Sequence, residues 1–183
     1  ATVTDANGEV IDGATVTWAT SGAAVSSAGL VTAVANGTAT ITATSGELEA
    51  TAVVTVAQAA ASVVLSDTVL TFASLGDTAT LTATVKDAND STIVSPTVTW
   101  TTSDTTVATV SSAGVVTSVA DGTATITATS GSASATASVT VTQVAASITL
   151  SPTTVSFTSF GDTATLTATV KDAKDSTMSG ASV

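Results

Sequence analysis

Polar and apolar residues alternate along most of this chain. Over residues 78–85 every second position is apolar and the positions between are threonine. The same period recurs over 97–101, 122–129 and 133–141. A period of two places the apolar side chains of a strand on one face, which is typical of a half-buried β-strand. No stretch has the helical period of 3.6. Pairs that contain glycine separate the runs and predict turns between strands.

The pattern repeats every 85 residues. The run 75–88 recurs at 160–173 with a difference only at its first residue, and the run 37–46 recurs unchanged at 122–131. A repeat of this length fits a small domain and is too long for a solenoid unit. Seven or eight short strands in about 85 residues predict an all-β sandwich.

The frame of the repeat divides the chain into three parts. Residues 59–143 form one complete unit, residues 1–58 match its back part, and residues 144–183 match its front part. Trp18 and Trp100 occupy inward positions of corresponding strands, as expected for the core tryptophan of an immunoglobulin-like fold. We therefore predict tandem immunoglobulin-like β-sandwiches, one complete and two partial. Because the pattern begins in mid-strand, we expect a fragment or a processed product.

Composition excludes several classes of function. The 183 residues include no Cys and no His, and three Lys or Arg stand against fourteen acids, for a net charge of −11. Disulfides and catalytic Ser-His-Asp triads are therefore absent, and zinc, haem and iron–sulfur sites are disfavoured. Without clustered cations we expect no nucleic-acid partner. No apolar run has the length of a membrane helix, so we expect no membrane insertion.

Several motifs of the complete unit resemble a known family. Val98-Thr-Trp100 and the runs 103–110, 113–116 and 122–128 strongly resemble bacterial immunoglobulin-like group 2 (BIG2) domains. The resemblance implies tandem domains of bacterial surface proteins, among them adhesins of the intimin and invasin type, and of some phage tail proteins. It implies no catalytic residues, so we expect no enzyme activity and an extracellular or cell-surface location. The segment before Val25 is shorter than in the complete unit, which predicts a poor strand there.

Two acidic loops are candidate calcium sites. Their oxygen-bearing side chains follow the spacing of a calcium loop, but no Glu closes the first loop at the expected distance. Asp side chains in such loops also bind their own backbone, and this structural role is the alternative. We expect no cofactor and no metal, with calcium as the other possibility. The candidate ligands are Asp5, Asn7, Glu9, Asp87, Asn89 and Asp90.

Two kinds of carbohydrate chemistry stay open. Asn36 and Asn89 lie in N-x-Ser/Thr sequences and are candidate glycosylation sites. Paired carboxylates serve glycosidases, but here most acids lie beside Gly or Thr in turns, so a turn role is favoured. Glycan binding needs exposed aromatic platforms, whereas Trp18 and Trp100 lie on the inward period.

The linkers favour a mechanical role. The segments 56–63 and 141–148 contain neither Gly nor Pro, which predicts a semi-rigid array. The leading hypothesis is a non-enzymatic module of a long surface protein, acting as the stalk or spacer of an adhesin or fibre. One alternative is a filament subunit joined head-to-tail to identical chains by strand complementation, and another is a glycan- or receptor-binding adhesive module. The expected partners are neighbouring repeats or identical chains, with any glycan or receptor bound at a tip outside this sequence.

Overall fold

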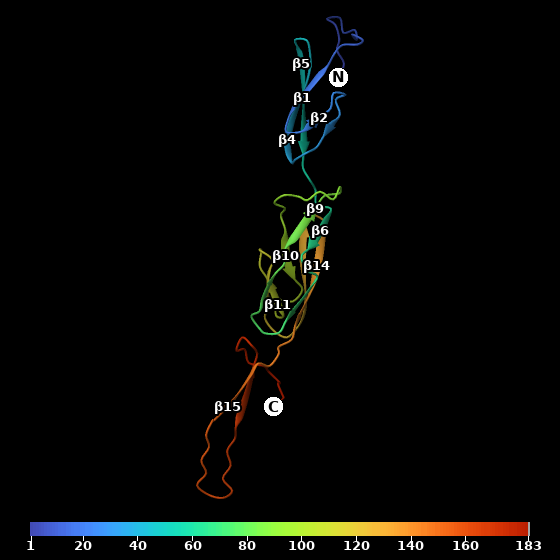
Figure 1. Cartoon of the computed structure of the whole chain (residues 1–183). Helices are drawn as coiled ribbons and strands as arrows, with labels where there is room; N and C mark the ends of the chain where they lie inside the picture. Colours follow the sequence, from blue (N-terminus) through green and yellow to red (C-terminus); the bar gives the residue numbers. More distant parts are fainter. Residues whose placement is uncertain (183) are drawn as a thin grey trace. The chain divides into compact units, whose positions relative to one another are not determined.

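The computed structural model describes residues 1–182, and its regular elements are all β-strands. Its contacts form two compact units, Ala1–Gln58 and Ala59–Val183. Figure 1 shows the strands in sequence colours. The first unit is called the N-terminal unit below. Within the second, residues 59–143 are called the central domain and residues 144–183 the C-terminal part. The three-part division drawn from the repeat stays a prediction.

The N-terminal unit contains one sheet and one short strand pair. The sheet has the order β1-β4-β5, from Thr17–Ser21, Gly37–Ser45 and Leu48–Val56, all antiparallel. The pair is β2 (Ala24–Val25) with β3 (Val31–Thr32). Each of these has two residues, whereas β11 and β12 at the corresponding places of the central domain have three and four. The short segment before Val25 predicts a poor strand there, and this prediction is confirmed by the two-residue β2.

The central domain is a sandwich of one four-stranded sheet and two smaller sheets that face it. The first sheet has the order β10-β13-β14-β7, from Thr99–Thr102, Gly122–Ser130, Ala133–Val141 and Val69–Phe72. The facing strands pair as β11-β12-β8, from Ala108–Val110, Val115–Ser118 and Thr78–Thr80, and as β6-β9, from Ser62–Leu65 and Ala83–Lys86. Only β7 and β14 run parallel among the pairings of residues 59–143.

The single strand predicted over residues 78–85 is in fact two strands, and this prediction was wrong. β8 pairs with β12, whereas β9 pairs with β6. Between them the Leu81 N–H donates to the Gly114 carbonyl at 2.9 Å, and the Thr82 N–H donates to Ser66 Oγ at 3.1 Å. At this point the hydrogen-bonding partner of the chain changes from β12 to β6. The β-ladder is therefore interrupted, although polar and apolar residues continue to alternate. With this break residues 59–143 contain nine strands.

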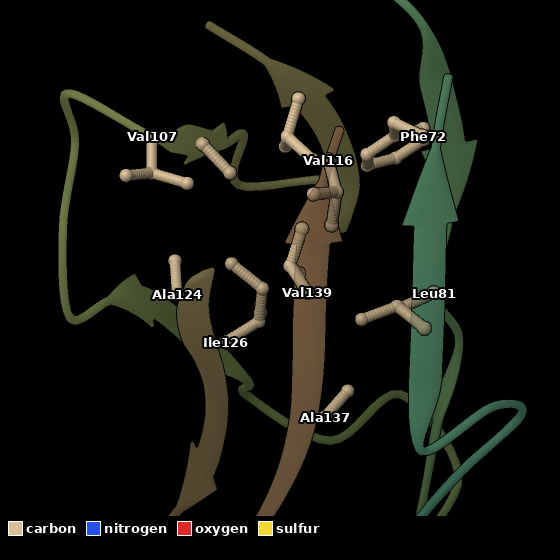
Figure 2. Packing of buried hydrophobic residues seen from close by; sticks show 10 residues of the cluster. Phe72, Leu81, Val107, Val116, Ala124, Ile126, Ala137 and Val139 are labelled. Atoms are coloured by element: carbon tan, nitrogen blue, oxygen red, sulfur yellow. The ribbon is translucent and has the colours of Figure 1, made fainter. Parts of the chain in front are cut away.

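The core of the central domain lies between the four-stranded sheet and the two smaller sheets. Ile126 and Val139 project from neighbouring strands of the first sheet, and Val116 and Leu81 face them from the other side (Figure 2). These four side chains are at most 1% exposed. A second cluster joins Val63 and Val85 to Ala128 and Ala133, and Trp100 packs against both clusters. The inward positions predicted from the alternation in β13 and β14 are therefore largely confirmed.

The C-terminal part contains one strand pair. β15 (Ser147–Ser151) and β16 (Thr167–Lys171) are antiparallel, in the register Ser147↔Lys171 to Ser151↔Thr167. Val170, which pairs with Ile148, is buried. The apolar residues Ile148 and Leu150 of β15 are exposed.

Candidate functional site

Three aspartates each organise a loop in the same way. Asp5, Asp87 and Asp172 use one carboxylate oxygen, Oδ1, to accept the N–H groups two and four residues later, all at 2.9 Å. An isolated bridge closes each loop, and these bridges are Thr4↔Val10, Lys86↔Thr92 and Lys171↔Thr177. The aspartate thus replaces missing backbone partners in a tight turn, which is the alternative that the sequence left open.

The calcium candidates do not form a ligand cage. In the first loop Asp5, Asn7 and Glu9 are exposed, and Asp5 Oδ1 is already bonded to two N–H groups. In the second loop Asp90 is bonded to Lys86 Nζ at 2.9 Å, which places a cation where calcium would need an open site. Within residues 1–182 no three acidic side chains gather closely enough to hold a metal ion. Asn89 lies exposed at the tip of its loop.

Each tryptophan lies against a glycine. Trp100 is half-buried and pairs in register with Ala128, and a Cβ atom on Gly114 would lie 3.1 Å from its ring. Trp18 pairs with Ala43, and a Cβ on Gly29 would lie 2.7 Å from its ring. Both glycines have φ of +79°, a region that glycine adopts without strain. Sequence reasoning placed the two tryptophans on the inward face but missed these contacts, although the glycines recur with the 85-residue repeat.

One sequon asparagine has a structural role. Asn36 Oδ1 accepts the Gln58 N–H at 2.7 Å, and Asn36 Nδ2 donates to Gln58 Oε1 at 3.0 Å. In the central domain Asp121 occupies the corresponding place and accepts the Gln143 N–H, also at 2.7 Å. Both side chains therefore fix a glutamine near the start of a linker. Asn36 is exposed, so glycosylation there stays a prediction.

Gln143, in the linker after β14, contacts the buried carboxylate of Asp172. Asp172 is 2% exposed, and its second oxygen, Oδ2, accepts the Leu75 N–H at 2.9 Å and Gln143 Nε2 at 3.0 Å. Burial acts to raise the pKa of Asp172, but the hydrogen bonds from Gln143, Leu75, Ser176 and Lys174 outweigh it and lower the pKa to about 2. Lys174 Nζ lies 3.8 Å from Asp77 Oδ1. In the sequence Asp172 is the counterpart of Asp87, 85 residues later, and the contacts of its second oxygen were not predicted.

Three further acids, Asp77, Asp104 and Asp162, have turn roles. Asp77 and Asp162 accept the N–H groups of Ser74 and Ser159, respectively. Asp104 accepts both the hydroxyl and the N–H of Thr106, and these bonds lower its pKa. The interpretation of these acids as turn residues is confirmed by these contacts. Asp67 is exposed.

Comparison with known proteins identifies the domain type. The fold is an all-β, immunoglobulin-like sandwich. Residues 59–141 match the bacterial Ig-like domain (group 2) family, and residues 23–58 match a second bacterial Ig-like domain family. The chain belongs to the bacterial immunoglobulin-like domain family, as its motifs predict. Among curated proteins none matches it.

Solved structures with a related arrangement include surface proteins. Domains 4 and 5 of the S-layer protein SbsC are 26% identical, with a TM-score of 0.43 over 76% of this chain and 78% of that one. Invasin, a bacterial integrin-binding protein, is 21% identical, with a TM-score of 0.49 over 98% of this chain and 43% of its own. InvD of Yersinia pseudotuberculosis is 20% identical, with a TM-score of 0.37 over 97% and 65% of the two chains. In residues 1–182 we find no helix of sufficient length and apolar character to cross a membrane.

Proposed function

We propose that this chain is a non-enzymatic structural module of an extracellular, cell-surface protein, in which it acts as a semi-rigid stalk or spacer. The observation that carries the proposal is the way the linker after β14 is bonded on both sides. The N–H groups of Thr142 and Val144 donate to Phe72 and Ala73 at 3.0 and 2.9 Å, and the Ala146 N–H donates to Lys171 at 2.8 Å. A linker held by backbone bonds to both neighbours has little freedom to bend.

The composition suits such a role. The linker contains neither Gly nor Pro, so no residue in it has unusual backbone freedom. A net charge of −11 opposes association between chains, and three lysines in 183 residues leave few sites for trypsin-like proteases. The acids that are repeated along the chain bind backbone N–H groups in turns and are thereby occupied in structural contacts.

The test is to compare orientation across the linker in solution. Residual dipolar couplings of the full chain, measured in a dilute alignment medium, should give one alignment tensor for residues 62–141 and for β15 with β16. A variant with Gly-Gly-Ser inserted between Val144 and Ala145 is the control for a flexible joint. If the unaltered chain gives two different tensors, as the insertion variant should, the spacer proposal is rejected.

A second candidate function is assembly of chains end to end, and the exposed apolar residues favour it. Ile148, Phe157 and Leu166 are 56%, 56% and 52% exposed. The residues 85 positions earlier, Val63, Phe72 and Leu81, are 9%, 7% and 1% exposed in the central domain. The C-terminal part therefore presents side chains of the type that the sandwich buries.

The N-terminal unit offers a matching surface. A pocket of about 160 Å³ there is lined by Val16, Ala43 and Leu48, among others. In the central domain the corresponding Ala128 and Ala133 pack against Val63 of β6. This correspondence supports contact between the front part of one copy and the back part of another, in which the segments 1–16 and 168–183, which carry the same strand, displace one another.

Light scattering over a concentration series, with negative-stain microscopy, tests this assembly. Head-to-tail complementation predicts polymers that grow with concentration and disappear in Leu166→Asp. Val94→Asp is the matched control, because Val94 is 81% exposed and has no place in the expected contact. A chain that stays monomeric throughout the series rejects this second function and leaves the spacer proposal unaffected.

A further inference from the structure

We propose that the central domain carries a recognition site for a carboxylate of the repeat that follows it, and that Asp172 is the carboxylate that fixes the joint. The site consists of the Leu75 N–H and the Gln143 side-chain amide. This inference rests on the proposed spacer function and names the contact that sets its rigidity.

The loop that presents the Leu75 N–H is held in place before any partner arrives. The Ser118 hydroxyl donates to the Ser74 carbonyl at 2.8 Å and accepts the Asp77 N–H at 2.9 Å. Asp77 Oδ2 accepts the Ser74 N–H at 3.1 Å, and Gly76 donates to the Ser118 carbonyl at 3.0 Å. Ser74 and Ser118 are both buried. A donor on so constrained a loop loses little entropy when it binds an acceptor.

The second donor is constrained as well. Asp121 Oδ1 accepts the Gln143 N–H at 2.7 Å, which fixes the backbone from which the side chain extends. Gln143 Nε2 then donates to Asp172 Oδ2 at 3.0 Å. Leu75 and Gln143 come from opposite ends of the central domain's sequence, so their meeting at one oxygen depends on the folded domain.

Asp172 has the properties of a bound ligand. Its two oxygens accept four N–H groups, two from its own loop and two from the central domain, at 2.9 to 3.0 Å. A buried carboxylate is unfavourable unless hydrogen bonds replace its water, and here four donors do so. Lys174, two residues later, lies 3.8 Å from Asp77 of the receiving loop and adds a weaker attraction of opposite charges.

The receiving loop recurs in the C-terminal part. Asp162 Oδ2 accepts the N–H groups of Thr158 and Ser159 at 3.2 and 3.0 Å, and the second of these bonds repeats that between Ser74 and Asp77. The runs 75–88 and 160–173 differ only at Leu75 and Phe160. Since recognition uses the backbone N–H of this residue, the exchange of its side chain leaves the site intact.

Distances between paired spin labels across the joint test the proposal in the full chain. The chain has no cysteine, so Thr136→Cys on β14 and Thr149→Cys on β15, both exposed, supply two label sites. Thirteen residues of extended chain span at most about 45 Å, which is within the range of the method. Gln143→Met removes only the donor from the central domain, whereas Asp172→Asn also disturbs its own loop. Asp175→Asn is the matched control, since Asp175 lies exposed in the same loop.

The unaltered chain and Asp175→Asn should give a narrow distance distribution. We expect both Gln143→Met and Asp172→Asn to broaden it about twofold, because an unclamped joint samples a range of angles. In a Trp18→Phe background, thermal unfolding followed through Trp100 should remain within about 2 °C of the value without the joint substitution, which shows that the central domain is folded. If either variant keeps the width of the control, the clamp is rejected and the spacer function stands. A distribution that is broad in the unaltered chain rejects both.

Discussion

A comparison of two glycines measures how tightly the sandwich is packed at Gly114. Gly114 and Gly76 have φ of +79° and +78°, so alanine at either position meets the same backbone strain. Around Gly76 nothing lies within 4 Å of an added Cβ atom. At Gly114 the added Cβ would overlap the Leu81 carbonyl oxygen and come within 3.1 Å of the Trp100 ring. The two substitutions therefore differ in the space available and not in backbone conformation.

The magnitudes follow from these two contributions. The left-handed conformation costs an L-residue about 1–2 kcal/mol, and the lower entropy of alanine in the unfolded chain recovers about 0.4–1 kcal/mol. Gly76→Ala should therefore lose about 1 kcal/mol of unfolding free energy. Overpacking adds about 1–3 kcal/mol, so Gly114→Ala should lose about 2–4 kcal/mol. For a domain of this size, this corresponds to a fall in Tm of about 8–30 °C for Gly114→Ala and about 4–8 °C for Gly76→Ala.

The assay is thermal and urea unfolding of both variants in a Trp18→Phe background, in which Trp100 is the sole tryptophan. Far-UV circular dichroism provides a second signal, since the Gly114 substitution alters the surroundings of Trp100. Equal losses of stability in the two variants would refute the reasoning. They would show that Leu81 and Trp100 move aside at negligible cost and that only the backbone conformation matters.

Three further predictions concern the core, the joint and the acidic loops. Ile126→Ala should cost about 2–5 kcal/mol because Ile126 is fully buried, whereas Val53→Ala, at a 73% exposed position, should change stability by less than about 0.5 kcal/mol in urea unfolding. The pKa of Asp172 is lowered from 3.8 to about 2, so its charged form is favoured by folding. Its contribution to the joint should be complete above about pH 4 and should be lost as the pH falls through 2, which spin-label distances will show; a joint that loosens already at pH 4 would contradict this. A millimolar excess of calcium should leave Tm unchanged, because Asp5 and Asp87 bind their own backbone; a rise in Tm would restore the calcium site.

The strands that depend on local alternation of polar and apolar residues could be predicted from the sequence. Pairings and hydrogen bonds between residues far apart in the sequence could not. β13 and β14 could be predicted because their threonine–apolar alternation is regular and a Ser-Gly turn joins them. The break at Leu81 and Thr82 could not, since the residues alternate through it and only the choice of neighbouring strand changes. Likewise the bond from Leu75 to Asp172 joins residues 97 positions apart. No local pattern in the loop of Asp172 indicates this distant partner.

The parallel pairing of β7 with β14 determines how the central domain responds to tension. Four residue pairs, from Ser138↔Val69 to Val141↔Phe72, connect a strand near the start of the domain to the strand that ends it. A pull on the two ends of the domain acts along these strands in opposite directions and loads them in shear. Bonds loaded in shear resist together, whereas bonds at an opening hairpin yield one at a time. The pairing that closes the sandwich thus also makes it resistant to extension.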